Sequence, residues 1–326
     1  MSQLSAEPAS FSPEFERYVD PAGHEFQFVR VRHENSRGLG IHFSAFFGAW
    51  GNKKRTRENF KGYFHRLRML GTCPDHDWLF LCDTYGFIEN GTYYTGKAGD
   101  LFVERAMLAI IAEEMRHRDH GYDQVVTVGS SMGGTGALTV GLHLGVAGVV
   151  TVCPHIDLDI CALQCTKYPE VAFACPDGDP GSPTNFGITR RIGMLLDRTS
   201  PEHPPPALFV QSVADDAGVH HEQVLPLVDR WRQHGGKVYL DVRPTGGHTS
   251  DFAPRALLLD AIDRMLEREP IDPGTYQRDP RFQGQPSHLT RGEVIIQSVR
   301  EKLTLRRRLK TVKGALHIRS TRTRPD

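Results

Sequence analysis

The sequence predicts an α/β protein built on one doubly wound, mostly parallel β-sheet that carries a cap insertion. Two observations support this prediction. Short apolar stretches typical of strands alternate with segments of helical spacing, and this alternation is interrupted between residues 154 and 206. Because parallel strands are joined by helices that cover both faces of their sheet, the alternation favours a doubly wound arrangement. With 326 residues, the chain is long enough to bury a substantial core.

The first half of the chain provides most of the predicted strands. Residues 1–23 are assigned to an N-terminal extension, because the alternation begins after them. The stretch 77–83, "DWLFLCD", is a short apolar run of the kind found in buried parallel strands. We expect strands at 24–32, 38–47, 77–83 and 124–129, and helices at 59–70, 101–118 and 133–145.

The second half of the chain continues the same pattern after a long interruption. The predicted main domain covers 24–270, and the interruption at 154–206 is interpreted as a cap or lid with one short helix at 187–197. Residues 271–326 are assigned to a basic C-terminal extension. We expect the remaining strands at 146–153, 207–213 and 237–243, and the remaining helices at 221–235 and 253–269.

Composition indicates an ordinary soluble protein of enzyme size. Hydrophobic residues make up 39% of the chain and charged residues 24%. The N-terminus is polar and no run of 18 or more apolar residues occurs, so we predict a protein that is neither exported by an ordinary signal nor membrane-spanning. The cysteines lack the spacing of a small secreted scaffold and favour reduced thiols in the cytoplasm: Cys73, Cys82, Cys153, Cys161, Cys165 and Cys175.

The stretch "VVTVGSSMGGTGAL", residues 125–138, contains the strongest motif of the chain. It places Ser131 in a G-x-S-x-G pattern, Gly129 to Gly133, between a predicted strand and a predicted helix. A serine at such a turn occupies a strained backbone position, and its neighbours two residues away must lack side chains. The alternative is a phosphate-binding turn, but no lysine follows as in a P-loop and the position is too late for a dinucleotide fingerprint. The pattern therefore favours a nucleophilic serine.

A nucleophilic serine needs a base and an acid that orients the base. His248 follows the last predicted strand, and Asp215 and Asp216 follow the strand before it. We prefer Asp215 as the acid because of its place at the end of the strand, and Asp216 remains the alternative, since it could instead cap the next helix.

Two backbone N–H groups are also expected to face the oxyanion that forms during acyl transfer. Met132, the residue after the serine, should provide one of them. The loop "IHFSAFFGAWGN" should provide the other, with Phe46 as first choice and Phe47 as second.

These motifs resemble those of the α/β-hydrolase superfamily over roughly residues 24–270, in which the nucleophile, acid and histidine occur in this chain order. A narrower pattern, "FSAFFG", Asp83, "GTYYTG" and "GSSMGGTGAL", is similar to that of capsular-polysaccharide proteins of the XcbB/CpsF type and of accessory-secretion acetyltransferases. The resemblance implies an acyl-enzyme mechanism on ester groups of a carbohydrate, without a cofactor. Plain carboxylesterase activity and an inactive binding protein of the same fold are the alternatives.

Several other residues are candidates for contacting a small-molecule or glycan ester substrate. Asp83 ends a predicted strand at the edge where ligands bind in this kind of sheet. Tyr93 and Tyr94 could line a sugar pocket, although tyrosines in loops more often pack against the protein surface. The candidates are Phe47, Asp83, Tyr93, Tyr94 and Ser130.

A metal site is not predicted. The stretch "CPHIDLDICALQC", residues 153–165, offers several ligand types, but the paired Cys-x₂-Cys or His-x₃-His units of structural zinc sites are missing. We instead expect this stretch to form the base of the cap above Ser131. The side chains considered are His155, Asp157, Asp159, Cys161 and Cys165.

The C-terminal tail is strongly basic. Residues 291–326 carry 11 lysines and arginines against three acidic residues, although the chain as a whole has zero net charge. Such a tail could make a peripheral contact with an anionic membrane, and a solvated extension is an equally good interpretation. Nucleic acid is disfavoured as a partner because the basic residues are not interleaved with aromatic side chains.

Overall fold

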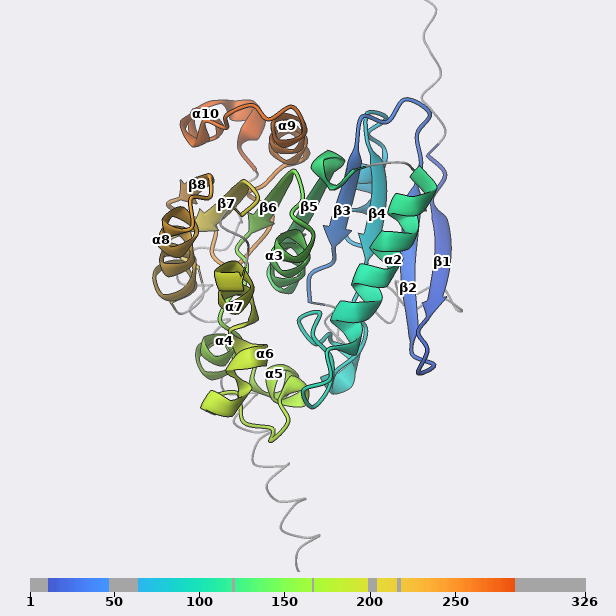
Figure 1. Cartoon of the computed structure of the whole chain (residues 1–326). Coiled ribbons are helices and arrows are strands. Elements are labelled where there is room, and N and C mark those ends of the chain that lie inside the picture. Colours follow the sequence, from blue (N-terminus) through green and yellow to red (C-terminus); the bar gives the residue numbers. More distant parts are fainter. Residues whose placement is uncertain are drawn as a thin grey trace, which may run out of the picture.

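The protein forms one eight-stranded sheet with helices on both faces (Figure 1). The computed structural model describes residues 11–46, 64–118, 121–165, 167–198, 204–215 and 218–284. The strands lie in the order β1-β2-β4-β3-β5-β6-β7-β8. Their bounds are β1 Glu14–Val19, β2 Glu25–Val31, β3 Leu39–Phe43, β4 Asp77–Leu81, β5 Val125–Ser130, β6 Gly148–Val152, β7 Ala207–Ser212 and β8 Val238–Arg243.

The sheet is parallel from β4 to β8, and only β1 and β2 run antiparallel to their neighbours. The predicted doubly wound, mostly parallel sheet is therefore confirmed. The α-helices of the described residues are α1 Leu67–Gly71, α2 Phe102–Arg118, α3 Met132–Leu144, α4 Leu158–Gln164, α5 Tyr168–Ala174, α6 Phe186–Thr189, α7 Arg191–Arg198, α8 Leu225–Gln233, α9 Arg255–Leu266 and α10 Pro273–Arg278. Shorter helical segments are η1 Phe87–Glu89, η2 Tyr122–Gln124, η3 Pro183–Asn185, η4 Val219–Val224 and η5 Pro280–Phe282.

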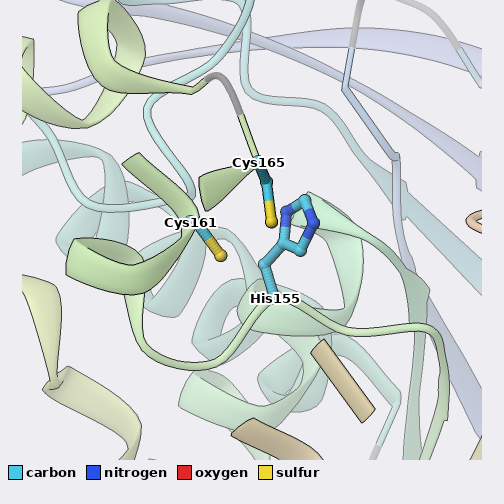
Figure 2. Close-up of side chains that lie close together, drawn as sticks. All are labelled: His155, Cys161 and Cys165. Carbon is cyan, nitrogen blue, oxygen red and sulfur yellow. The ribbon is translucent and has the colours of Figure 1, made fainter. Parts of the chain in front are cut away.

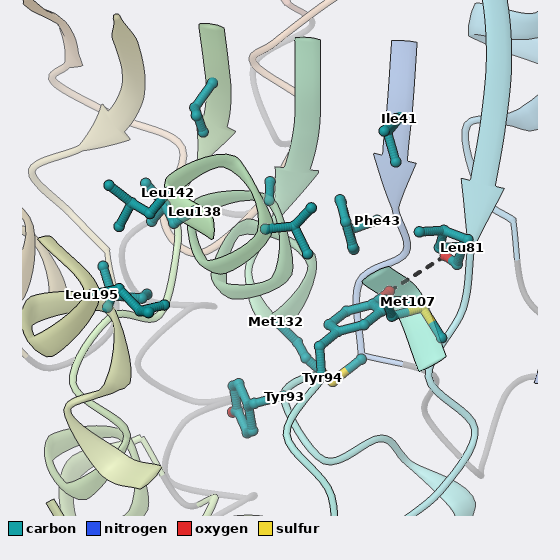
Figure 3. Packing of buried hydrophobic residues seen from close by; sticks show 14 of the residues in the cluster. Ile41, Phe43, Leu81, Tyr93, Tyr94, Met107, Met132, Leu138, Leu142 and Leu195 are labelled. Atoms are coloured by element: carbon teal, nitrogen blue, oxygen red, sulfur yellow. Dashed lines mark hydrogen bonds between the residues drawn. The ribbon is translucent and has the colours of Figure 1, made fainter. Parts of the chain in front are cut away.

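Two apolar cores cover the two faces of the sheet. One core packs α2, α3, α7 and α8 against the sheet (Figure 3), and the other packs α1, α9 and α10 against the opposite face. Every residue of β5 is buried, and its valines alternate between the cores, with Val125 in the first and Val126 and Val128 in the second. A central parallel strand needs apolar residues on both faces, which explains the continuous apolar run at this position.

The insertion between β6 and β7 contains more helices than the sequence indicated. The predicted helix 187–197 is observed as α6 and α7, but α4 and α5 were not expected. Each of the two has seven residues, which is about two turns and too short to display a clear helical repeat. In Figure 1 these short helices gather beside the edge of the sheet at which the parallel strands end.

Parts of both predicted extensions belong to the folded body. β1 pairs with β2 along six residues, within the segment assigned to the N-terminal extension. After residue 270, α10 and η5 pack near β8, where Arg243 pairs with the buried Asp241 at 2.6 Å and donates to the carbonyl of Tyr276 at 3.1 Å. β1 was missed because it is mostly exposed and carries charged side chains, as edge strands often do.

Two predicted helices differ from the observed ones, one in where it begins and the other in its type of helix. Of the stretch 59–70, only residues from 64 onward are described, and the helix there begins at Leu67. The stretch 221–235 starts as the π-helical segment η4 and continues as α8. No helix in the described part of the chain combines the length and hydrophobicity that spanning a bilayer requires.

Candidate active site

Ser131 lies in the sharp turn between β5 and α3, with the strained backbone angles φ 53° and ψ −123°. The flanking glycines make this turn possible. A Cβ on Gly129 would approach the carbonyl oxygen of Gly133 to 2.0 Å, and a Cβ on Gly133 would approach that of Phe43 to 2.2 Å. A non-glycine residue in this conformation costs on the order of 1–3 kcal/mol, so the fold holds Ser131 there against its own preference.

Three side chains from separate loops form a hydrogen-bonded chain at this turn. Ser131 Oγ lies 2.8 Å from His248 Nε2, and His248 Nδ1 lies 2.7 Å from Asp215 Oδ1. Asp215 follows β7 and His248 follows β8, so both come from the carboxyl ends of parallel strands that lie beyond β6 in the sheet order. Of the two acids considered, Asp215 is the one that contacts His248; Asp216 lies outside the described residues.

The carboxylate of Asp215 is held from two further directions. Gln211, fully buried on β7, donates from Nε2 to Asp215 Oδ2. The buried thiol of Cys153 contacts the carbonyls of Gly247 and Thr249 at 3.8 Å, in the loop that carries His248. Burial, followed by the negative charge of Asp215, raises the pKa of Cys153 well above its usual range, so the group beside the carboxylate is a neutral thiol.

A second histidine lies flat against the first. The rings of His155 and His248 stack with centroids 4.6 Å apart and an angle of 8° between their planes. Burial, and then the charge of His248, lowers the pKa of His155 well below its usual range, which favours a neutral ring. From the sequence, His155 was weighed as a metal ligand and placed in the base of the cap above Ser131, but this stacking was not predicted. The two stacked residues are 93 positions apart in the sequence, and no local sequence pattern predicts such a contact.

One predicted oxyanion group directly follows the serine and the other lies after β3. Met132 is the first residue of α3, so its N–H has no carbonyl within the helix to bond and the positive end of the helix dipole points toward Ser131. Phe46 follows β3 and is half-buried, with the Lys167 ammonium 4.2 Å from the centre of its ring. Phe47 lies outside the described residues.

Asp83 and Tyr94, two of the candidate substrate contacts, are buried and form hydrogen bonds with backbone groups. Asp83 is fully buried and accepts hydrogen bonds from the N–H groups of Tyr85, Thr92 and Tyr94 at 3.1, 2.6 and 2.9 Å. Burial raises its pKa although these hydrogen bonds oppose the rise. Tyr94 donates to the carbonyls of Ser44 and Leu81 and packs in the apolar cluster with Phe43 (Figure 3).

Tyr93 and Ser130 are also buried, so neither presents a side chain at the surface. The hydroxyl of Tyr93 lies 3.2 Å from His155 Nδ1, and both side chains are buried. Ser130 is the last residue of β5, and its hydroxyl has no hydrogen-bond partner among the described residues. Tyr93 thus supports the stacked histidines rather than forming a surface platform for a sugar ring.

A separate cavity of about 340 Å³ lies at the opposite edge of the sheet. Its lining comes from residues that precede β6, β7 and β8 and from the end of α9, including Pro204 to Pro206, Lys237 and Arg268. It contains none of the residues predicted to act in catalysis.

The sequence matches no known family model. It also has no significant match among curated proteins. Similarity is found at the level of structure, where the identities are low.

A capsule O-acetyltransferase of Neisseria meningitidis serogroup A superposes with a TM-score of 0.54 at 15% identity, over 77% of this chain and 92% of that chain. FphF, a fluorophosphonate-binding serine hydrolase of Staphylococcus aureus, gives a TM-score of 0.54 at 13% identity, over 79% and 97%. The glycosylation-associated Gap123 complex of Streptococcus agalactiae also gives 0.54, at 18% identity, over 78% of this chain but only 45% of that chain. The protein therefore has the α/β-hydrolase fold, as the sequence resemblance indicated.

Proposed function

We propose that this protein is a serine hydrolase or acyltransferase that forms an acyl-enzyme on Ser131 and acts on ester groups of carbohydrates. The observation that carries the proposal is the hydrogen-bonded chain from Asp215 through His248 to Ser131, with contacts of 2.7 and 2.8 Å. A serine hydroxyl is a weak nucleophile unless a base lies within hydrogen-bond reach and that base is itself oriented. Both requirements are met within the described residues.

In the first half of the reaction, His248 Nε2 takes the proton of Ser131 as Oγ attacks the ester or thioester carbonyl. Asp215 holds the ring through Nδ1 and stabilises the imidazolium that forms. The N–H groups of Met132 and Phe46 donate hydrogen bonds to the carbonyl oxygen as it becomes negatively charged. His248 then gives the proton to the leaving alcohol or thiol, and the acyl group stays on Ser131.

In the second half, an acceptor hydroxyl attacks the acyl-enzyme. His248 removes the acceptor's proton, the ester to Ser131 breaks, and Oγ recovers its proton from the imidazolium. Water as the acceptor gives hydrolysis, and a sugar hydroxyl gives transfer. Every bond change is covered by these residues, so the proposal requires no cofactor.

The carbohydrate part of the proposal draws on the structural neighbours. One of them is named as a capsule O-acetyltransferase and another as part of a glycosylation-associated complex. A further structure of the capsule enzyme is named as a complex with CoA, which makes acetyl-CoA a sensible first donor to test. A plain carboxylesterase and a binding protein without turnover are the two alternatives, and both share the same fold.

Turnover with matched donors tests the proposal. We would measure acetyl release from p-nitrophenyl acetate and from acetyl-CoA, with and without an acetyl-free bacterial polysaccharide, and analyse the polysaccharide for new O-acetyl groups. Acetylated polysaccharide formed by the wild type but not by Ser131→Ala would support transfer. Hydrolysis of the simple ester without any polysaccharide product would favour the carboxylesterase. No turnover of either donor would favour the binding protein.

A further inference from the structure

Three potential metal ligands meet in the buried space behind the stacked histidines. Candidate ligand atoms of His155, Cys161 and Cys165 all lie within 4.8 Å of one another. The three residues are 1%, 0% and 5% exposed. Figure 2 shows the two sulfur atoms directed toward the imidazole ring from the cap helix and the residue that ends it.

The fold fixes these side chains before any ligand arrives. Cys161 lies within α4 and Cys165 caps its C-terminus, and the spacing of four residues places both on one side of the helix. His155 precedes this helix, and its backbone is anchored because its carbonyl accepts from Thr135 Oγ1 at 2.6 Å. A preformed arrangement of this kind lowers the ordering cost of binding an ion.

One ring nitrogen of His155 has no partner within the described part of the protein. His155 Nδ1 lies 3.2 Å from the hydroxyl of Tyr93, whereas the buried Nε2 has no hydrogen-bond partner among the described residues. Buried imidazoles ordinarily use both nitrogens, and an ion that takes one of them leaves the other to the surrounding polar groups. Asp159, also considered from the sequence, pairs with Arg190 at 2.9 Å and is not part of the cluster.

We propose that His155, Cys161 and Cys165 bind one zinc ion, which links the cap helix α4 to the segment after β6. One imidazole nitrogen of His155 and the two thiolates form the ligand set. Thiolate and imidazole ligands select zinc over magnesium or calcium, which require oxygen ligands. Binding releases the protons of the two thiols and leaves the neutral imidazole as the third ligand.

The site has a consequence for the residues that carry the proposed reaction. His155 stacks on His248, so an ion bound to His155 fixes the surface against which the catalytic ring rests. The second group of metal-ligand residues, Cys153, Asp215 and His248, belongs to the Ser131 site and is not a second metal centre. The zinc ion is thus a positioning element that does not touch the reacting atoms.

Metal titration of the full-length chain tests the proposal. We would remove metal with a chelator under a phosphine reductant, add Co²⁺ as the spectroscopic probe, and then displace it with Zn²⁺. We expect one equivalent of cobalt, a thiolate-to-cobalt charge-transfer absorption in the near ultraviolet, and complete loss of that absorption on adding zinc. Cys161→Ser and Cys165→Ser should each weaken cobalt binding by at least about a hundredfold, more than is typical for the loss of a residue that only orients a ligand.

Cys175→Ser is the matched control, because Cys175 is another buried cysteine of the cap that lies outside the cluster. It should bind cobalt like the wild type. Protection of the two thiols from alkylation by added zinc, mapped by peptide mass spectrometry on the wild type, tests the same claim should a serine variant not fold. Absence of the absorption in the reduced wild type would overturn the proposal. So would its retention in both variants, or a Cys161–Cys165 disulfide whose reduction yields no metal uptake.

Discussion

The two edges of the sheet differ in what they bring together. At the carboxyl edge, loops after β5, β7 and β8 place Ser131, Asp215 and His248 in hydrogen-bond contact. At the amino edge, a cavity of about 340 Å³ offers space but none of these groups. Its Arg268 pairs with Asp123 at 3.2 Å on the surface, and both side chains are mostly exposed.

The two edges therefore differ in the side chains that they bring together. Parallel strands end at one edge, so the segments that follow them converge there, whereas the opposite edge receives the segments that lead into strands. Strain, burial and shared hydrogen bonds are concentrated at the carboxyl edge, as in the positive φ of Ser131 and the fully buried Gln211. The comparison makes the following predictions, from the largest effect to the smallest.

Ser131→Ala should remove the proposed activity almost entirely. Because the serine forms the covalent intermediate, kcat for ester turnover should fall by a factor on the order of 10⁵ to 10⁶. Steady-state kinetics with an activated acetyl ester measures this loss. A residual rate within tenfold of the wild type would show that Ser131 is not the nucleophile.

Asp215→Asn should lower kcat by a factor on the order of 10⁴, because the amide cannot stabilise the imidazolium or hold the ring in the required tautomer. Asp216→Asn is the matched control and should change kcat by less than about threefold, since we assign the orienting role to Asp215, which contacts His248. A larger loss of kcat in Asp216→Asn than in Asp215→Asn would show that Asp216 is the acid that orients His248.

Gln211→Leu should have an intermediate effect. The substitution removes the donor to Asp215 Oδ2 without touching substrate, so kcat should fall about 10- to 100-fold while KM stays nearly constant. The kcat and KM values from one saturation curve separate these effects. A rise in KM with unchanged kcat would mean that Gln211 acts on substrate binding instead.

Glu104→Gln should reduce the free energy of unfolding by about 2–3 kcal/mol, the range expected for charge-assisted hydrogen bonds. Glu104 on α2 contacts His143 at 2.9 Å and pairs with Arg191 on α7. Burial alone would raise the pKa of Glu104, but the hydrogen bonds from His143 and Arg191, with their charges, outweigh it and hold the pKa below the usual 4.5.

A lowered pKa means that this stabilisation is present above about pH 4.5 and is lost as the pH falls through the folded-state value. The difference between wild type and Glu104→Gln in chemical denaturation should therefore shrink in that acidic range. Asp100→Asn is the control, because Asp100 forms an exposed pair with Arg105 and should cost less than about 0.5 kcal/mol. Equal losses of unfolding free energy in Glu104→Gln and Asp100→Asn would contradict the stabilising role of Glu104.

Lys237→Ala should have the smallest effect. It removes a charged side chain from the cavity at the amino edge, far along the strands from the proposed chemistry, and kcat should stay within about twofold. A loss comparable to that of Gln211→Leu would contradict the contrast between the two edges.

The sequence was most informative where chemistry forces a local pattern. The turn at Ser131 requires glycines two residues to either side, and these glycines are visible in the sequence. The order of the strands places Asp215 and His248 at the same edge, so their convergence followed once the strands were recognised. Asp215, the acid that the sequence favoured, has its Oδ1 2.7 Å from His248 Nδ1.

The sequence was least informative where contacts join distant segments. The stacking of His155 on His248 depends on how the chain leaves β6, and nothing near His155 encodes it. Asp83 was a candidate because it ends a strand and Tyr94 because tyrosines can line a sugar pocket, but the sequence did not reveal that both bind backbone groups in the interior. The cap helices α4 and α5 were missed because two turns provide too little periodicity.

Covalent labelling with a fluorophosphonate probe tests the central claim most directly. The wild type should gain one adduct by intact mass, mapped to the peptide that contains Ser131, and the adduct should be absent from Ser131→Ala and His248→Ala. Ser130→Ala, which changes the adjacent buried serine, should be labelled like the wild type. A wild-type protein that takes up no probe, or an adduct that persists in Ser131→Ala, would contradict the account.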